Sequence, residues 1–157
     1  FTRHENLRLA GGKAPVALIA RPLAADGSNL PLVGRAQPGA GPTIWISEAM
    51  PDLYGWRVGQ QVALPLAGKL VDLHVAGVWR DYARQTGAIM IDLADYRRLT
   101  GDRLVNDAAI DLAADADAGR VASALTALAG PGVLEVARPG EIRALSLRVF
   151  VRAFAVA

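Results

Sequence analysis

Two histidines and a few hydroxyl and carboxylate groups are the side chains that could perform acid–base or nucleophilic chemistry in this 157-residue chain. Asp72 and His74 lie two positions apart, which places both on one face of a strand. The acid that orients a catalytic histidine usually comes from another element, so this spacing does not favour a catalytic pair with either His74 or His4. Ser47 is outside any Gly-x-Ser-x-Gly elbow and is predicted to cap a short helix. The sequence therefore favours a protein that is not an enzyme.

Three aspartates near the C-terminal third suggest a calcium site at first sight. A calcium-binding loop that begins at Asp115 would, however, place Arg120 where glycine is required and Thr126 where glutamate is required. Asp117 is better explained as the cap of a helix than as a ligand beside Asp111 and Asp115. The glycines do not follow a phosphate-binding pattern either. We therefore expect neither a metal ion nor another cofactor.

The composition is that of an ordinary folded protein. Hydrophobic residues make up 52% and charged residues 20% of the chain, and the net charge is +2. The basic residues are spread among nearly as many acids, which argues against nucleic-acid binding. Cysteine is absent, which excludes disulfides and thiolate metal sites. No uninterrupted apolar run of 18 residues occurs, and the chain opens on Phe1 without a signal peptide, so it reads as an excised fragment that does not span a bilayer by itself.

The elements that must position these residues are mostly short strands. Apolar runs between turn-forming residues predict strands at residues 16–20, 30–36, 43–46, 58–66, 70–79 and 88–91. Ala67-Gly68 is expected to be the turn of a β-hairpin. On its second strand, Val71, Leu73, Val75 and Trp79 are expected to share one face.

Helices are expected between and after these strands. One follows Ser47 and ends at Gly55, and another runs from the cap Asp92 to Gly101. Residues 108–113 and 133–136 are then predicted to be strands on either side of a helix capped by Asp117, with an apolar stripe formed by Val121, Leu125 and Leu128. The prediction is an α+β fold of mixed sheets and short helices, with a βαβ unit near the C-terminus that leads to a juxtamembrane helix.

The last helix is the most informative element for function. Glu141, Arg148 and Arg152 fall within a wedge of roughly 40° on a helical wheel. Apolar residues cover most of the remaining circumference, and no charge follows Arg152. Such a helix is either buried against the sheet or continues into a membrane. In the second case the three charged residues would belong to a juxtamembrane coupling helix.

Aromatic and arginine side chains could form a contact with a partner. Two of the three tryptophans are expected in the core. Trp56, next to Arg57 in a turn, could be exposed, which leaves Trp45 and Trp79 as the core residues. Tyr82 and Arg84 lie in a loop after the hairpin, where such residues commonly form interfaces. The alternative for this loop is an ordinary solvated segment.

Several motifs occur in an order that is similar to a known family. The chain resembles the periplasmic core domain of MacB/FtsX-like ABC transporter permeases over roughly residues 44–157, through Ile46-Ser47-Glu48, Tyr54-Gly55-Trp56, Val58-Gly59 and the run from His74 to Asp81. The tail from Glu141 to Val156 also resembles that family's approach to its next transmembrane helix.

The resemblance implies a domain of two lobes. Residues 1–29 and 105–157 would form a membrane-proximal α/β lobe whose leading helix is absent, and residues 30–104 an inserted strand-rich lobe. The domain would be non-catalytic, would face the periplasm from the bacterial inner membrane, and would couple ATP hydrolysis by a cytoplasmic ABC ATPase to an extracytoplasmic event.

The implied partners are the ATPase, a second permease copy or homologue, and a periplasmic protein or a lipid or peptide substrate. Nucleic acid is not among them. Two other functions stay open on the sequence alone. One is a free-standing periplasmic binding or regulatory module without transport, and the other is a small enzyme in which His74 meets a nucleophile from another element.

Overall fold

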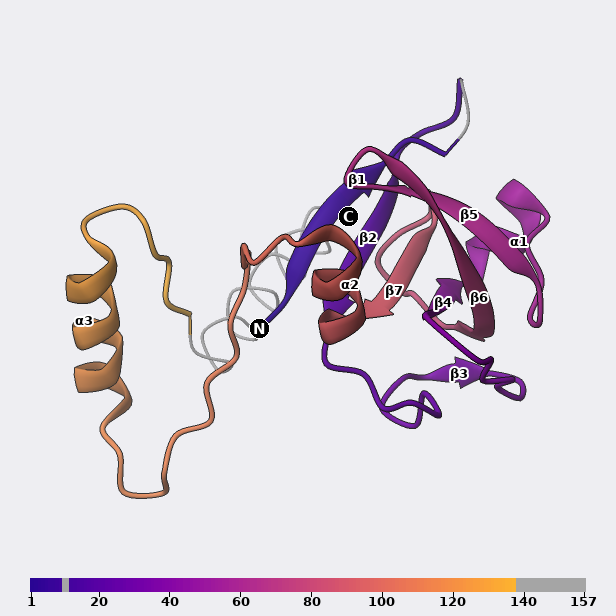
Figure 1. The fold of residues 1–157 in the computed structure, drawn as a ribbon. Helices are drawn as coiled ribbons and strands as arrows, with labels where there is room; N and C mark the ends of the chain where they lie inside the picture. The colour runs from indigo at the N-terminus through magenta and orange to yellow at the C-terminus, as the bar shows by residue number, and fades with distance from the viewer. Residues whose placement is uncertain (10–11, 138–157) are drawn as a thin grey trace, which may run out of the picture. The chain divides into compact units, whose positions relative to one another are not determined.

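The computed structural model describes residues 1–9 and 12–137 of the chain. The chain forms two compact units that divide after Ala109. The first unit holds a mixed sheet and two short helices, and the described part of the second holds one helix (Figure 1). All the buried hydrophobic side chains of the described residues belong to the first unit, between Leu7 and Tyr96.

Seven strands form the sheet of the first unit, which confirms the predicted α+β class. Along it the order is β1, β2, β7, β4, β6 and β3, and β5 also pairs with β6. The pairs β2–β7 and β4–β6 are parallel and the others are antiparallel. The strands are β1 (Arg3–Leu7), β2 (Val16–Arg21), β3 (Leu32–Val33), β4 (Thr43–Ser47), β5 (Gln61–Leu66), β6 (Lys69–Trp79) and β7 (Ala88–Asp92).

Both faces of the central strands are buried. In β4, Ile44 and Ile46 point into a larger core, and Trp45 between them points into a smaller core on the other face. The helices α1 (Ala49–Tyr54) and α2 (Leu93–Thr100) add Met50 and Tyr96 to the larger core. The smaller core is completed by the segment between β2 and β4, through side chains that include Leu23, Leu30 and Leu32. Because both faces of these strands are buried, their sequences are continuous apolar runs.

A β-bulge in β6 corrects one prediction. Ile44 pairs with Val75, but the next residue, Trp45, pairs with Gly77, so Ala76 is the extra residue. Side chains of a strand alternate between faces, and one extra residue reverses the alternation. Trp79 therefore lies in the smaller core, whereas Val71, Leu73 and Val75 pack in or against the larger one. The expectation that all four share one face was wrong.

The helix α2 begins and ends at the predicted residues. The carboxylate of Asp92 accepts hydrogen bonds from the backbone N–H groups of Ala94 and Asp95, at 2.8 and 3.3 Å. Gly101 ends the helix with φ of 73°, in the left-handed region that glycine adopts most readily. Gly55 ends α1 in the same way with φ of 69°. The caps identified from local sequence at these three positions are confirmed.

The second unit contains α3 (Ala118–Ala129), whose predicted cap is also confirmed. The carboxylate of Asp117 accepts hydrogen bonds from the N–H groups of Gly119 and Arg120, at 2.7 and 3.1 Å. Leu128 on its expected apolar stripe is 86% exposed. The strands predicted at residues 108–113 and 133–136 are irregular segments in the structure. A short alternating run forms a strand only where a neighbouring strand accepts its hydrogen bonds.

The first two strands belong to the same sheet as the strands from residues 30–104. β1 pairs with β2, and β2 pairs with β7, so residues 1–29 share a single sheet with strands from residues 30–104. β2 is apolar on both faces, with Leu18 and Ile19 buried in different cores. Such a strand is most stable in the interior of a sheet, where both faces are covered.

Candidate functional site

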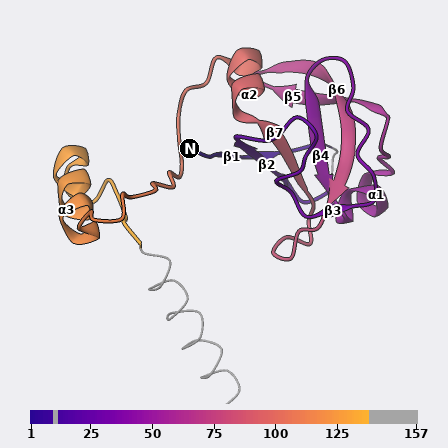
Figure 2. The same cartoon turned by 90° about the horizontal axis from the view of Figure 1, so that it is seen from below.

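The directions of the strands define two ends of the sheet. β1, β4 and β6 finish at one end, where β2 and β7 begin. We call it the α1 end, because α1 follows β4 there; the connection between β1 and β2 and the loop between β6 and β7 lie at the same end (Figure 2). The opposite end, where α2 follows β7, is called the α2 end. Of the residues predicted from the sequence, Ser47, Trp56, Tyr82 and Arg84 lie at the α1 end.

Ser47 at the α1 end has a role other than the predicted one. Its hydroxyl oxygen accepts a hydrogen bond of 2.9 Å from the backbone N–H of Ala88, and its side chain is fully buried. Glu48 occupies the cap position of α1 and makes no capping hydrogen bond with its side chain. Ser47 therefore joins β4 to the start of β7 and does not cap the helix. The prediction failed because Ser47 is the last residue of β4 and its side chain points inward.

Two motif segments that are distant in the sequence meet beside Ser47. β4 and β6 run parallel, and Ser47 pairs with Trp79. The backbone N–H of Glu48 donates a hydrogen bond of 3.1 Å to the carbonyl of Trp79. The side chains of Glu48 and Arg80 lie 3.5 Å apart and are half-exposed, so this ion pair contributes little to stability. The contact joins the first and last parts of the motif run into one local structure.

Trp56 lies in a small aromatic cluster at the α1 end. It is half-buried, and the centroid of its ring is 5.8 Å from that of Tyr54. The ammonium group of Lys13 lies 4.4 Å from the Tyr54 ring centroid and donates a hydrogen bond to the carbonyl of Leu53. Lys13 thus links the connection between β1 and β2 to α1. Trp56 is the least buried tryptophan, as expected, and part of its ring packs against the larger core.

Tyr82 and Arg84 lie in the loop between β6 and β7. Tyr82 is 84% exposed. Arg84 forms an ion pair with Asp81 at 3.3 Å, and the other oxygen of Asp81 accepts a hydrogen bond of 2.9 Å from the N–H of Ala83. Two neighbouring side chains raise the pKa of Arg80 above its usual value, and Tyr82 has a larger effect than Glu48. Of the residues predicted to contact a partner, Tyr82 is the most exposed, whereas Trp56 and Arg84 are half-buried.

The other predicted residues do not join this cluster. Glu141, Arg148 and Arg152 lie outside the described residues. His74 lies on β6, where its Nε2 atom is 2.6 Å from the carbonyl oxygen of Gln37. His4 lies on β1, and its Nε2 atom is 2.8 Å from a carboxylate oxygen of Asp107. In residues 1–9 and 12–137, no group of three or more histidine or acidic side chains is arranged to hold a metal ion.

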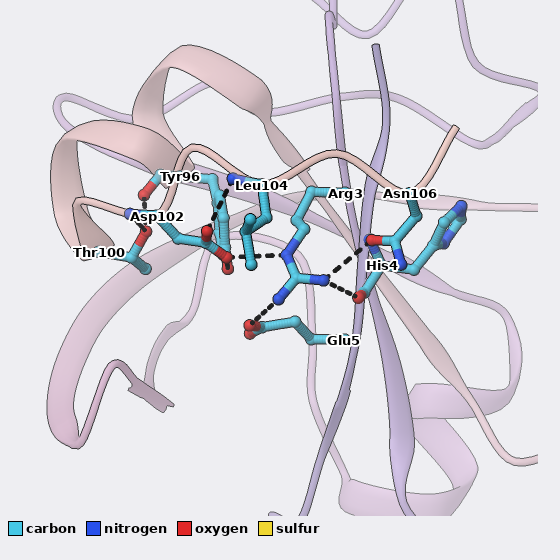
Figure 3. Close-up of polar contacts among 8 residues, drawn as sticks. All are labelled: Arg3, His4, Glu5, Tyr96, Thr100, Asp102, Leu104 and Asn106. Carbon is cyan, nitrogen blue, oxygen red and sulfur yellow. Dashed lines mark hydrogen bonds and ion pairs between the residues drawn. The ribbon is translucent and has the colours of Figure 1, made fainter. Parts of the chain in front are cut away.

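A polar cluster at the α2 end was not anticipated from the sequence (Figure 3). Its centre is Arg3, whose guanidinium contacts Asp102 at 2.8 Å and Glu5 at 3.1 Å. It also donates hydrogen bonds to the side-chain oxygen of Asn106 and the carbonyl of His4, at 3.0 and 3.2 Å. The cluster thus joins β1 to the segment that follows α2.

Asp102 receives several hydrogen bonds in this cluster. The N–H of Leu104 donates to one carboxylate oxygen at 2.8 Å, and the hydroxyl of Tyr96 donates to the other at 3.0 Å. The Leu104 N–H and then Arg3 hold the pKa of Asp102 below its usual value. Burial, and then the carboxylates of Glu5 and Asp102, raise the pKa of Tyr96. Arg3 and Glu5 share one strand face two residues apart, but Asp102 is 99 residues from Arg3, so no local pattern could reveal the contact.

Comparisons with known proteins give no family for the chain. No protein-family model matches it, and a search of curated proteins found no significant match. None of the helices within residues 1–9 and 12–137 combines the length and hydrophobicity needed to cross a bilayer.

Proposed function

We propose that this chain is a non-catalytic extracytoplasmic domain of an ABC transporter permease, which couples ATP hydrolysis on the other side of a membrane to an extracytoplasmic substrate or partner protein. The observation that carries the proposal is the ordered run of motif residues from Ile46 to Asp81, which resembles MacB/FtsX-like permeases. Under this proposal the domain belongs to a protein of the bacterial inner membrane and faces the periplasm.

The local structure of the motif residues supports the proposal. Ser47 is buried and bonds to β7, Gly55 ends α1, and Gly77 leaves room for the ring of Trp45. Glu48 contacts Trp79 and Arg80 from the other part of the run. The motif residues therefore form one structural unit around β4 and β6.

The α2 end supports the proposal in a second way. Thr2 and Asp107 form an isolated antiparallel bridge, so the start of β1 and the end of the first unit lie side by side. Ends that lie close together allow a folded domain to be inserted between two other segments of a chain, such as two membrane-spanning segments. The α1 end, with exposed Tyr82 and half-buried Trp56, then lies at the opposite end of the strands and is available to a periplasmic partner.

Coupling through the C-terminal residues tests the proposal. The full-length protein is purified in detergent with its membrane partners, and ATP hydrolysis is measured with and without the double substitution Arg148→Ala and Arg152→Ala. We expect ATP hydrolysis to copurify with the full-length protein, and its rate to change in the double variant while the thermal unfolding of the domain does not.

The variant Arg98→Ala is a matched control, because Arg98 is exposed and its surface ion pair with Asp95 on α2 contributes little to stability. Its ATP hydrolysis should equal that of the unaltered protein. A full-length protein without associated ATP hydrolysis would contradict the transport function and favour a free-standing periplasmic module.

A further inference from the structure

The segment Asp102–Asp107 leaves α2 and runs beside the start of β1. We call these residues the strap. Its backbone bonds to Thr2, the residue directly before β1: the N–H of Thr2 donates to the carbonyl of Asp107 at 2.7 Å, and the carbonyl of Thr2 accepts from the N–H of Asn106 at 2.9 Å. The side-chain oxygen of Asn106 accepts a hydrogen bond of 2.8 Å from the backbone N–H of His4. The strap thus occupies the outer edge of β1, which no strand of the described residues covers.

Polar contacts hold the strap, and apolar burial contributes little. Leu104 is 66% exposed and Val105 is also exposed. The remaining contacts are hydrogen bonds and ion pairs, whose net contributions in partly exposed positions are small. The strands beneath are instead fixed by two buried cores. Segments with few buried apolar contacts open locally before the rest of the protein unfolds.

Arg3 joins the two ends of the strap. It bonds Asp102 at the start and Asn106 near the end, and it is fixed from the other side by Glu5. A guanidinium offers five N–H donors in a rigid plane, which a lysine ammonium cannot reproduce. The Arg3 side chain is mostly buried, so its bonds are partly shielded from water. Loss of this single side chain removes contacts at both ends at once (Figure 3).

We propose that residues 102–107 form a strap that detaches from β1 as a unit, and that Arg3 is the residue that fastens it. The first unit then has a fastened state and a released state, while its two cores stay intact. In the permease function proposed above, on which this role rests, a pull on the chain beyond Asp107 reaches the sheet through the strap. Release would uncover the edge of β1.

Amide hydrogen exchange in the 157-residue chain tests the strap without any membrane. The reporting amides are those of Thr2, His4 and Asn106, whose hydrogen bonds join the strap to residues 2–4. The core amides of β4 and β7 report global unfolding. We expect the strap amides to exchange faster than the core amides, through a separate opening. Arg3→Gln should accelerate the strap amides by on the order of tenfold and leave the core amides unchanged.

Two further variants sharpen the experiment. Arg3→Lys keeps the positive charge but loses the planar set of N–H donors. Its strap amides should exchange at a rate between those of Arg3→Gln and the unaltered chain. Arg98→Gln removes an exposed ion pair on α2 and should change neither set of amides. Strap amides that exchange only with the core, or that do not respond to Arg3→Gln, would overturn the proposal. Because the readout uses the isolated chain, such a failure is distinct from a failure of the permease function.

Discussion

At the scale of single residues, Ser47 gives the clearest stability prediction. Ser47→Ala removes the acceptor of the buried Ala88 N–H. A buried donor left without a partner costs about 1–3 kcal/mol. We expect the free energy of unfolding, measured with a chemical denaturant, to fall by about this amount.

The control for this change is Ser123→Ala, because Ser123 lies on the exposed side of α3. Its effect should stay within about 0.5 kcal/mol, as for most surface substitutions. Equal unfolding free energies for Ser47→Ala and Ser123→Ala would show that the Ser47–Ala88 hydrogen bond makes no net contribution to stability.

Asp102 predicts how the strap responds to acid. Its pKa is lowered in the folded chain by the Leu104 N–H first and Arg3 second. A group with a lowered folded pKa stabilises the folded form above its unfolded pKa, and this contribution is lost as pH falls through the folded pKa. We therefore expect the strap amides to lose protection in acid before the core amides do.

An NMR titration of the Asp102 carboxyl tests the origin of this shift. The midpoint should lie below the usual 3.8 and should rise in Arg3→Gln. Glu5→Gln removes the other carboxylate beside Arg3 and is the control for that neighbour. Tyr96 on α2, His4 on β1 and Asp107 in the strap are further titratable groups nearby. An unchanged midpoint in Arg3→Gln would mean that Arg3 does not act on Asp102.

Residues that act locally could be predicted, and residues with distant partners could not. The caps Asp92 and Asp117 bond N–H groups two and three positions ahead, so the signal lies within one window of sequence. Ser47 is also of a residue type that commonly caps helices, but its actual hydrogen-bond partner is 41 residues away. Arg3 is similar, since tertiary contacts select its partners.

At the scale of elements, the strands of the first unit were found because their apolar runs are buried on both faces. The bulge at Ala76 was not found, because it is a property of the pairing between β6 and β4. Its result is that Trp79 faces the smaller core together with Trp45. The unpaired segments at residues 108–113 and 133–136 illustrate the same limit, because a strand requires a partner.

Gly77 in β6 gives a prediction at this scale. A Cβ atom added at Gly77 would lie 2.8 Å from the ring of Trp45, closer than packed atoms allow. Gly77→Ala should therefore lower the free energy of unfolding by about 1–3 kcal/mol, the typical cost of overpacking.

Replacing Trp45 by phenylalanine removes the ring atoms that the new methyl group meets. The cost of Gly77→Ala should be smaller in the Trp45→Phe background than in the unaltered chain, and a double-mutant cycle measures the difference. Equal costs in both backgrounds would contradict a direct contact between residues 45 and 77.

At the scale of the whole molecule, the buried core of the described residues is confined to the first unit. A fragment of residues 1–109 should therefore fold, with an unfolding midpoint in denaturant close to that of the 157-residue chain. A second fragment that ends at Gly101 lacks the strap and should be less stable, because Arg3 and Tyr96 lose their bonds to Asp102. A fragment 1–109 that fails to fold would contradict the independence of the unit.

The most direct test of the central claim is the side of the membrane on which this domain lies. The chain has no cysteine, so single cysteines can be placed at Tyr82 and Leu70, which are 84% and 76% exposed, and at the buried Val75. The measurement is labelling by a membrane-impermeant maleimide in intact cells that express the full-length protein, with any cysteines outside this segment replaced by serine. The account predicts that Tyr82→Cys and Leu70→Cys react without permeabilisation, whereas Val75→Cys reacts only after denaturation. Labelling of the two exposed positions only after the membrane is permeabilised would contradict an extracytoplasmic domain.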